Sequence, residues 1–257
     1  MHKRILRCLL LACLSSGQLL AGTDPFVGKW KLDTVHSHLT DQMKVESAGA
    51  NKYRFNFDGT TVETVVADGS DHPGLSGTKL SVTVEDTRTW KVVRKKNGRI
   101  LLTATWKLSP DGHTLRDSFT EFQPDGSSFT VNYIYERTAG TSGFPGTWES
   151  TTSQFDSAFE IQIRPYRGDG LSFVTPAQGT TRDVEFDGND HANPGVAPGL
   201  TTSGHRANGH TLQLTDKMNG KLADTREISL SEDGRTLTIT VHQSGRANPS
   251  VLVFDRQ

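Results

Sequence analysis

The sequence contains only two cysteines, Cys8 and Cys13, and both lie within its first 22 residues. If that segment is removed, the remaining chain has no cysteine, which excludes disulfide bonds and thiolate chemistry. The chain also lacks a basic excess, because 25 Lys and Arg face 29 Asp and Glu beyond residue 22. We therefore expect neither nucleic-acid binding nor electrostatic attachment to a membrane surface.

Only one long apolar run occurs, and it lies at the N-terminus. Lys3 and Arg4 precede an apolar stretch that reaches Leu20 and ends in small residues. This pattern predicts a signal peptide over 1–22 and export to the periplasm or the extracellular space. The segment Leu10–Cys13 is similar to a bacterial lipoprotein box, so a lipid anchor at Cys13 is the alternative. No other stretch is long enough to cross a bilayer as a helix.

Helical periodicity is missing as well, and a period of two replaces it. Even positions of 100–108 are apolar, whereas the odd positions include Thr103, Thr105 and Lys107. Asn97-Gly98 and Asn219-Gly220 favour tight hairpins. We predict an all-β protein in which hairpins connect about 8–10 strands per unit into an up-and-down barrel. A β-sandwich is the alternative fold.

The chain repeats itself with a period of about one domain. Phe26–Trp30 returns as Phe144–Trp148, 118 residues later, and Asp68–His72 returns as Asp187–His191. A period of this length indicates duplicated domains rather than a solenoid. We predict domain 1 over 23–138, a linker over 139–143 and domain 2 over 144–257.

Gly-x-Trp opens each unit and an Arg closes it, a combination that resembles lipocalins and their relatives. Each unit also carries a hairpin motif, Ser109–Leu115 in the first and Ser231–Leu237 in the second. Together these motifs are similar to tandem lipocalin-like, calycin-type domains of secreted bacterial proteins of uncharacterised function. The resemblance implies that each Trp closes one end of a barrel, with the Arg of the same unit across its ring. The six residues with this structural role are Gly28, Trp30 and Arg137, then Gly146, Trp148 and Arg256.

Three charged residues occupy rows that are apolar in the sister unit. With the units aligned at an offset of 122, Asp224 replaces Leu102 and Arg226 replaces Ala104, whereas Asp117 stands where unit two has Ile239. A charge in a barrel interior is costly unless it is paired or hydrated. One interpretation is a polar cavity floor that orients a ligand, with Arg226 binding a carboxylate. The other is that these rows face solvent or that the charges pair with neighbours.

The repeated Asp-His loops are a second candidate site. Asp71 and His72 match Asp190 and His191, and such groups could hold a polar ligand at a barrel mouth. Asp-Gly and Pro-Gly steps around them also favour simple turns. We predict no metal, no cofactor and no catalytic residue.

Three functions remain open. The first is an exported binding protein that holds a small apolar or amphipathic ligand in a barrel. The second is an envelope or interaction scaffold with filled barrels, since side chains alone can fill a small barrel. The third is an enzyme with a His/Asp site at a barrel mouth. The sequence does not define the ligand or the oligomeric state.

Overall fold

The computed structural model of the protein describes residues 24–57 and 62–257. The predicted signal peptide, with Cys13, lies outside the described residues. Apart from the short 3-10 turn η1 (Leu75–Gly77), every regular element of the described chain is a strand. No helix among the described residues is long and apolar enough to span a bilayer.

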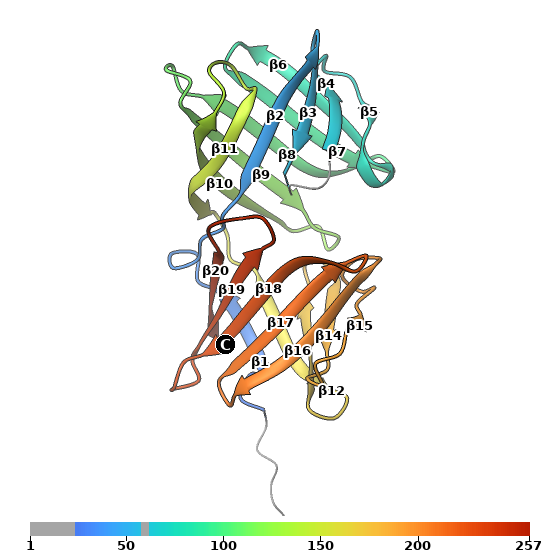
Figure 1. Cartoon of the computed structure of the whole chain (residues 1–257), viewed down its shortest axis with the longest axis vertical. Coiled ribbons are helices and arrows are strands. Elements are labelled where there is room, and N and C mark those ends of the chain that lie inside the picture. The colour runs from blue at the N-terminus through green and yellow to red at the C-terminus, as the bar shows by residue number, and fades with distance from the viewer. Residues whose placement is uncertain (1–23, 58–61) are drawn as a thin grey trace, which may run out of the picture.

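Two antiparallel sheets of 10 strands each curl into nearly closed barrels, as predicted (Figure 1). Barrel 1 is formed by β2 (Gln42–Gly49), β3 (Lys52–Asn56), β4 (Val62–Val66), β5 (His72–Pro73), β6 (Lys79–Asp86), β7 (Thr89–Lys96), β8 (Arg99–Leu108), β9 (Thr114–Phe122), β10 (Ser128–Ala139) and β11 (Gly146–Phe155). Barrel 2 is formed by β1 (Gly28–Leu32), β12 (Glu160–Tyr166), β13 (Gly170–Thr175), β14 (Thr180–Val184), β15 (His191–Ala192), β16 (Leu200–Asn208), β17 (Thr211–Met218), β18 (Lys221–Leu230), β19 (Thr236–Gln243) and β20 (Ser250–Arg256).

Hairpins join most neighbouring strands, and the predicted Asn-Gly turns are among them. Asn97 and Asn219 both adopt positive φ, at 52° and 51°, in the β7–β8 and β17–β18 turns. The two edge strands of each sheet do not pair with each other: these are β4 and β5 in barrel 1, and β14 and β15 in barrel 2. In barrel 2 the buried side chain of Asn193 bridges this gap, accepting from the Asp183 N–H at 2.8 Å and donating to the Asp183 carbonyl at 2.9 Å. A side chain thus replaces the missing strand pairing and keeps the buried backbone satisfied.

The two barrels exchange their first strands, which corrects the predicted domain boundaries. β1 lies between β12 and β20 in barrel 2, and β11 lies between β10 and β2 in barrel 1. Figure 1 shows blue β1 among the orange and red strands. The predicted linker 139–143 is part of the β10–β11 turn rather than a connection between domains. A short connection favours pairing of adjacent antiparallel strands, and this fixes β11 in barrel 1.

The exchange makes the open ends of the barrels face each other. The chain passes between the barrels twice, through 33–41 and through 156–159. β1 and β11 therefore both run from an outer end toward the junction. At the junction, Arg246 of barrel 2 donates to the carbonyls of Thr40 and Phe57 and forms an ion pair with Asp41 at 3.0 Å. Val131 of β10 belongs to the apolar cluster that fills barrel 2.

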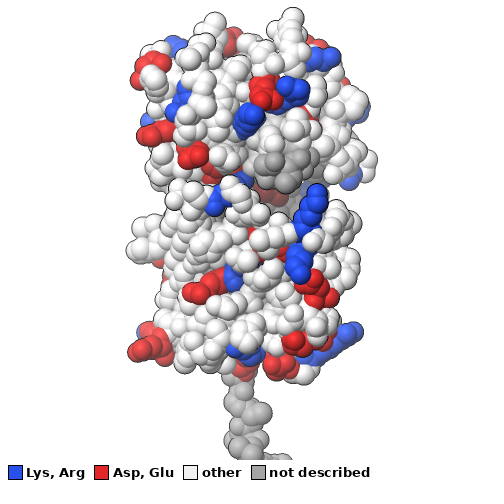
Figure 2. Space-filling view, in the orientation of Figure 1, with Lys and Arg blue, Asp and Glu red and all other residues white. Residues whose placement is uncertain are grey.

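Charges of both signs are scattered over the face of the molecule drawn in Figure 2. There, Lys and Arg lie among Asp and Glu along both barrels.

Candidate functional site

The outer end of each barrel is sealed by a tryptophan beneath an arginine. The Arg256 guanidinium lies 4.1 Å from the Trp30 ring centre, and Arg137 lies 4.1 Å from that of Trp148. The predicted partners were the opposite ones, Trp30 with Arg137 and Trp148 with Arg256. Strand exchange explains the difference, because each first strand brings its Trp into the other barrel.

Both arginines also anchor the backbone around the seal. Arg256 donates to the carbonyls of Gly234 and Val27 at 2.6 and 3.0 Å, so its charge is held by peptide dipoles as well as by the ring. A Cβ atom at Gly28 would lie 2.7 Å from Arg256 Nη1, and one at Gly146 would lie 2.7 Å from Arg137 Nη1. These two glycines therefore allow the close approach of the arginines. The outer ends are structural seals and leave the inner ends for binding.

Barrel 1 encloses a cavity of about 390 Å³, called cavity 1, that opens toward the junction. Its walls are mainly apolar and aromatic, and a few polar groups converge on them. Barrel 2 contributes Gln243, Arg246 and Ser250 to the rim, so this cavity belongs to both halves of the chain. The aromatic side chains in its wall are Phe55, Phe57, Trp106, Phe119, Tyr133 and Tyr135.

Asp117 is a carboxyl group buried in this wall. It lies on β9 between its cross-strand neighbours Trp106 and Tyr133, and only 7% of it is exposed. Its Oδ1 and the Nε1 of Trp106 are buried without a hydrogen-bond partner among the described residues. Burial raises the pKa of Asp117 to about 7; a hydrogen-bonding interaction with the Trp106 indole, which falls short of good geometry, opposes this rise, and the charge of Asp41 adds to it. Cavity 1 thus contains an unsatisfied acid.

Asp41, by contrast, is well partnered. The Tyr135 hydroxyl donates to its Oδ2 at 2.7 Å, and Arg246 binds its Oδ1. Burial raises the pKa of Asp41, although both partners favour the carboxylate. Tyr135 is buried and its neighbour Tyr133 is half-buried, and desolvation raises the pKa of both hydroxyls. This group forms a polar rim at the mouth of the cavity.

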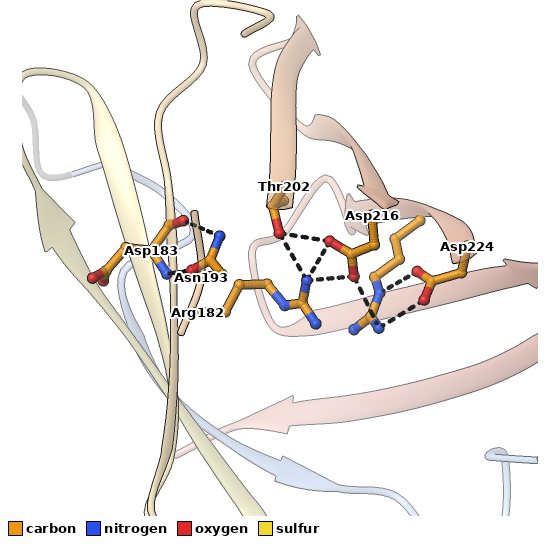
Figure 3. A network of polar contacts seen from close by, with 7 residues as sticks. Arg182, Asp183, Asn193, Thr202, Asp216 and Asp224 are labelled. Carbon is orange, nitrogen blue, oxygen red and sulfur yellow. Dashed lines mark hydrogen bonds and ion pairs between the residues drawn. The ribbon is translucent and has the colours of Figure 1, made fainter. Parts of the chain in front are cut away.

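Barrel 2 has a cavity of similar size, about 360 Å³, called cavity 2. Its charged groups form hydrogen bonds and ion pairs with one another. Figure 3 shows Arg182 of β14, Thr202 of β16 and Asp216 of β17 pointing toward one another. Arg226 lies beside them, 2.8 Å from Asp224 Oδ1 through Nε and 3.4 Å from Asp216 Oδ2 through Nη2. Asp224 and Arg226 were predicted to bind a ligand, with pairing to neighbours as the alternative; the structure contains the pairing, and of the two only Arg226 lines the cavity.

The barrels contain the same buried ion pair with its signs reversed. In barrel 1, Glu63 of β4 binds Arg94 of β7 at 2.5 Å, and in barrel 2 the corresponding positions are Arg182 of β14 and Asp216 of β17. Burial opposes ionisation of Glu63, yet its hydrogen bonds from Arg94 and the Leu75 N–H lower its pKa overall. Each charge is therefore compensated within its own barrel.

The Asp-His loops follow β4 and β14, which both run away from the junction. In barrel 2 the loop begins near the outer end, because Arg206 stacks on Phe186 and binds Asp24, just before β1. The loop then returns along the barrel, where Lys217 near the end of β17 binds Asp190. None of the four predicted residues, Asp71, His72, Asp190 and His191, lines either cavity.

Local contacts account for these loops. Asp68 and Asp187 each accept from the His four residues later at 2.9 and 3.0 Å, while Lys95 binds Asp71 and Lys217 binds Asp190. Such contacts are typical of turns. Glu185, Asp187 and His191 have ligand atoms within 4.8 Å of one another, but the acids are already hydrogen-bonded or paired.

Sequence comparison of the two units located Asp117 but missed the rest of the cavity wall. Aligning Tyr135 with Phe254, or Arg94 with Asp216, would have indicated further polar positions inside the barrels. Asp41 and Arg246 carry no such signal, because both lie in connections whose neighbours are set only by the packing of the two barrels.

Comparison of the chain with protein-family models and with curated proteins found no match to either.

Proposed function

We propose that this protein is an exported, lipocalin-like binding protein that holds a small amphipathic ligand in the cavity of barrel 1. One observation carries this proposal: an apolar, largely aromatic cavity of about 390 Å³ into which a few polar groups converge. Pockets for small ligands usually exceed about 300 Å³ and combine apolar walls with a small number of orienting polar groups.

Cavity 1 is favoured over cavity 2 by its unsatisfied polar atoms. In barrel 2, Arg182 and Arg226 are neutralised by Asp216 and Asp224, so a ligand would have to break existing pairs. In barrel 1, Asp117 Oδ1 and Trp106 Nε1 are buried without partners among the described residues. A ligand that supplies those hydrogen bonds removes a desolvation cost of about 1–3 kcal/mol per group.

Binding can be measured with the neutral fluorescent probe N-phenyl-1-naphthylamine, whose emission rises in apolar surroundings. We expect saturable, one-to-one binding to the wild-type protein. Ala104→Phe adds a ring inside cavity 1, and we expect it to weaken probe binding at least tenfold because the ring occupies the probe's volume.

The matched control is Val241→Phe, which places the same ring in cavity 2 at the position that Phe119 occupies in barrel 1. We expect this variant to bind the probe as the wild type does. Equal loss in both variants, or no saturable binding to the wild type, would contradict a ligand site in barrel 1.

A further inference from the structure

Cavity 1 contains one acidic group that nothing in the described chain neutralises. Asp41 is paired with Arg246, and Arg94 is paired with Glu63, so these charges are already compensated. Asp117 forms no ion pair with any described residue; the neutral Trp106 indole interacts with it as a hydrogen-bond donor, without good geometry to Oδ1. A buried acceptor of this kind is costly to leave unpaired, and native proteins rarely do so without a reason.

In its carboxylate form Asp117 needs a hydrogen-bond donor, and a cation would satisfy it best. A ligand carboxylate or phosphate would meet a second acid at this position and would be repelled. An ammonium group offers up to three N–H donors and a positive charge, and charge-assisted hydrogen bonds are about twice as strong as neutral ones.

We propose that barrel 1 selects amines with an apolar, preferably aromatic body, whose ammonium group binds Asp117. This assignment deepens the proposed function and rests on it. The body would lie against the aromatic wall formed by Phe55, Phe119 and their neighbours. The head would sit deep in the barrel, between β8 and β10, where the carboxyl group of Asp117 lies.

Protonation provides an independent signature of this contact. The pKa of Asp117 is about 7 without a ligand, so near pH 6 the group is mostly protonated. A bound ammonium favours the carboxylate, and binding then releases a proton at that pH. The other charged or titratable groups around the cavity are Asp41, Tyr133, Tyr135, Arg246 and the Glu63–Arg94 pair. Burial raises the pKa of Asp41 as well, although Arg246 and Tyr135 already favour its carboxylate without a ligand, and the two tyrosine pKa values are raised away from this range.

Three naphthalene derivatives with matched bodies test the assignment by calorimetry: 2-(1-naphthyl)ethylamine, 1-naphthaleneethanol and 3-(1-naphthyl)propionate. We expect the amine to bind the wild type at least tenfold more tightly than the alcohol, and the carboxylate to bind most weakly. We also expect only the amine to release a proton at pH 6, detected by comparing buffers of different ionisation enthalpy.

Asp117→Asn removes the charge and preserves the shape of the side chain. We expect it to weaken amine binding at least tenfold and to change alcohol binding by less than twofold. Glu232→Gln, the same chemical change at an exposed hairpin, is the control and should bind as the wild type does. The comparison of the three ligands uses only the wild-type protein, so the test does not depend on how well Asp117→Asn folds.

The outcomes separate the two proposals. Suppose that N-phenyl-1-naphthylamine binds. If the alcohol or the carboxylate then binds as tightly as the amine, or if none of the three matched compounds binds, amine selection is overturned and a ligand-binding barrel stands. If neither the probe nor any of the three compounds binds, the proposed function fails and amine selection fails with it.

Discussion

At the scale of single residues, Asp117 shows how burial controls protonation. The pKa of an aspartate in an unfolded chain is about 3.9, whereas the pKa of Asp117 in the barrel is about 7. The native state therefore holds this proton more tightly than the unfolded state does. The resulting stabilisation is complete below the unfolded pKa and is lost as the pH rises through the folded one.

We therefore expect the stability of the wild type to decline more steeply with pH than that of Asp117→Asn. Between pH 4 and pH 8, the free energy of unfolding of the wild type should fall by roughly 3–4 kcal/mol more than that of the variant. Urea unfolding at a series of pH values measures this difference. Glu232→Gln should follow the wild type, and parallel curves for wild type and Asp117→Asn would refute the shifted pKa.

The two barrels keep a buried ion pair at the same positions, with the positive and negative members exchanged. Glu63 and Arg94 in one barrel correspond to Arg182 and Asp216 in the other, so the pair survives although each member changed sign. Removing one partner of a buried pair leaves an uncompensated charge and costs about 3–5 kcal/mol. We therefore interpret such pairs as structural, and we place the unpaired Asp117 in the proposed ligand site.

At the scale of elements, β1 and β11 are interchangeable to a first approximation. Both begin with Gly-x-Trp, and both bury the Trp on the inward face. Either strand could complete either barrel by its hydrophobic pattern, so local sequence does not decide between them. The short β10–β11 turn does, because it keeps β11 beside β10 and leaves the corresponding place in barrel 2 for β1.

This topology predicts which fragment folds. Residues 42–155 contain all ten strands of barrel 1, whereas 23–138 lack β11 and with it Trp148. We expect 42–155 to unfold cooperatively on heating and to show near-UV circular dichroism from its fixed aromatic side chains. We expect 23–138 to show neither. The reverse result would show that the barrels do not exchange strands.

At the scale of the whole molecule, the two open ends close each other. The 33–41 and 156–159 crossings hold the barrels together, and Arg246 and Val131 each extend from one barrel into the surroundings of the other. Phe129 of β10 also lies against Phe159, a wall residue of cavity 2, with ring centres 6.2 Å apart. Unfolding of one barrel therefore exposes apolar surface of the other.

We accordingly expect one calorimetric unfolding transition for the wild type. The double variant Phe129→Ala/Arg246→Ala removes an apolar and a polar contact of the junction, and we expect it to separate the unfolding of the two barrels into two transitions. Phe173→Ala, inside barrel 2 and away from the junction, should lower the transition temperature without splitting it. Two transitions in the wild type would show that the barrels unfold independently.

The sequence by itself determined the strands, the hairpin turns, the duplication and the residues of the two seals. These features depend on local patterning: alternation of apolar side chains, Asn-Gly steps and the recurrence of Gly-x-Trp. Only the tertiary structure decided which barrel each first strand joins, because the two strands are alike and the pattern fits either position. It also decided that Asp117 faces a cavity without a partner while Asp224 and Arg226 are paired. The charges that meet inside a closed sheet come from strands far apart in the chain, and their meeting depends on closure.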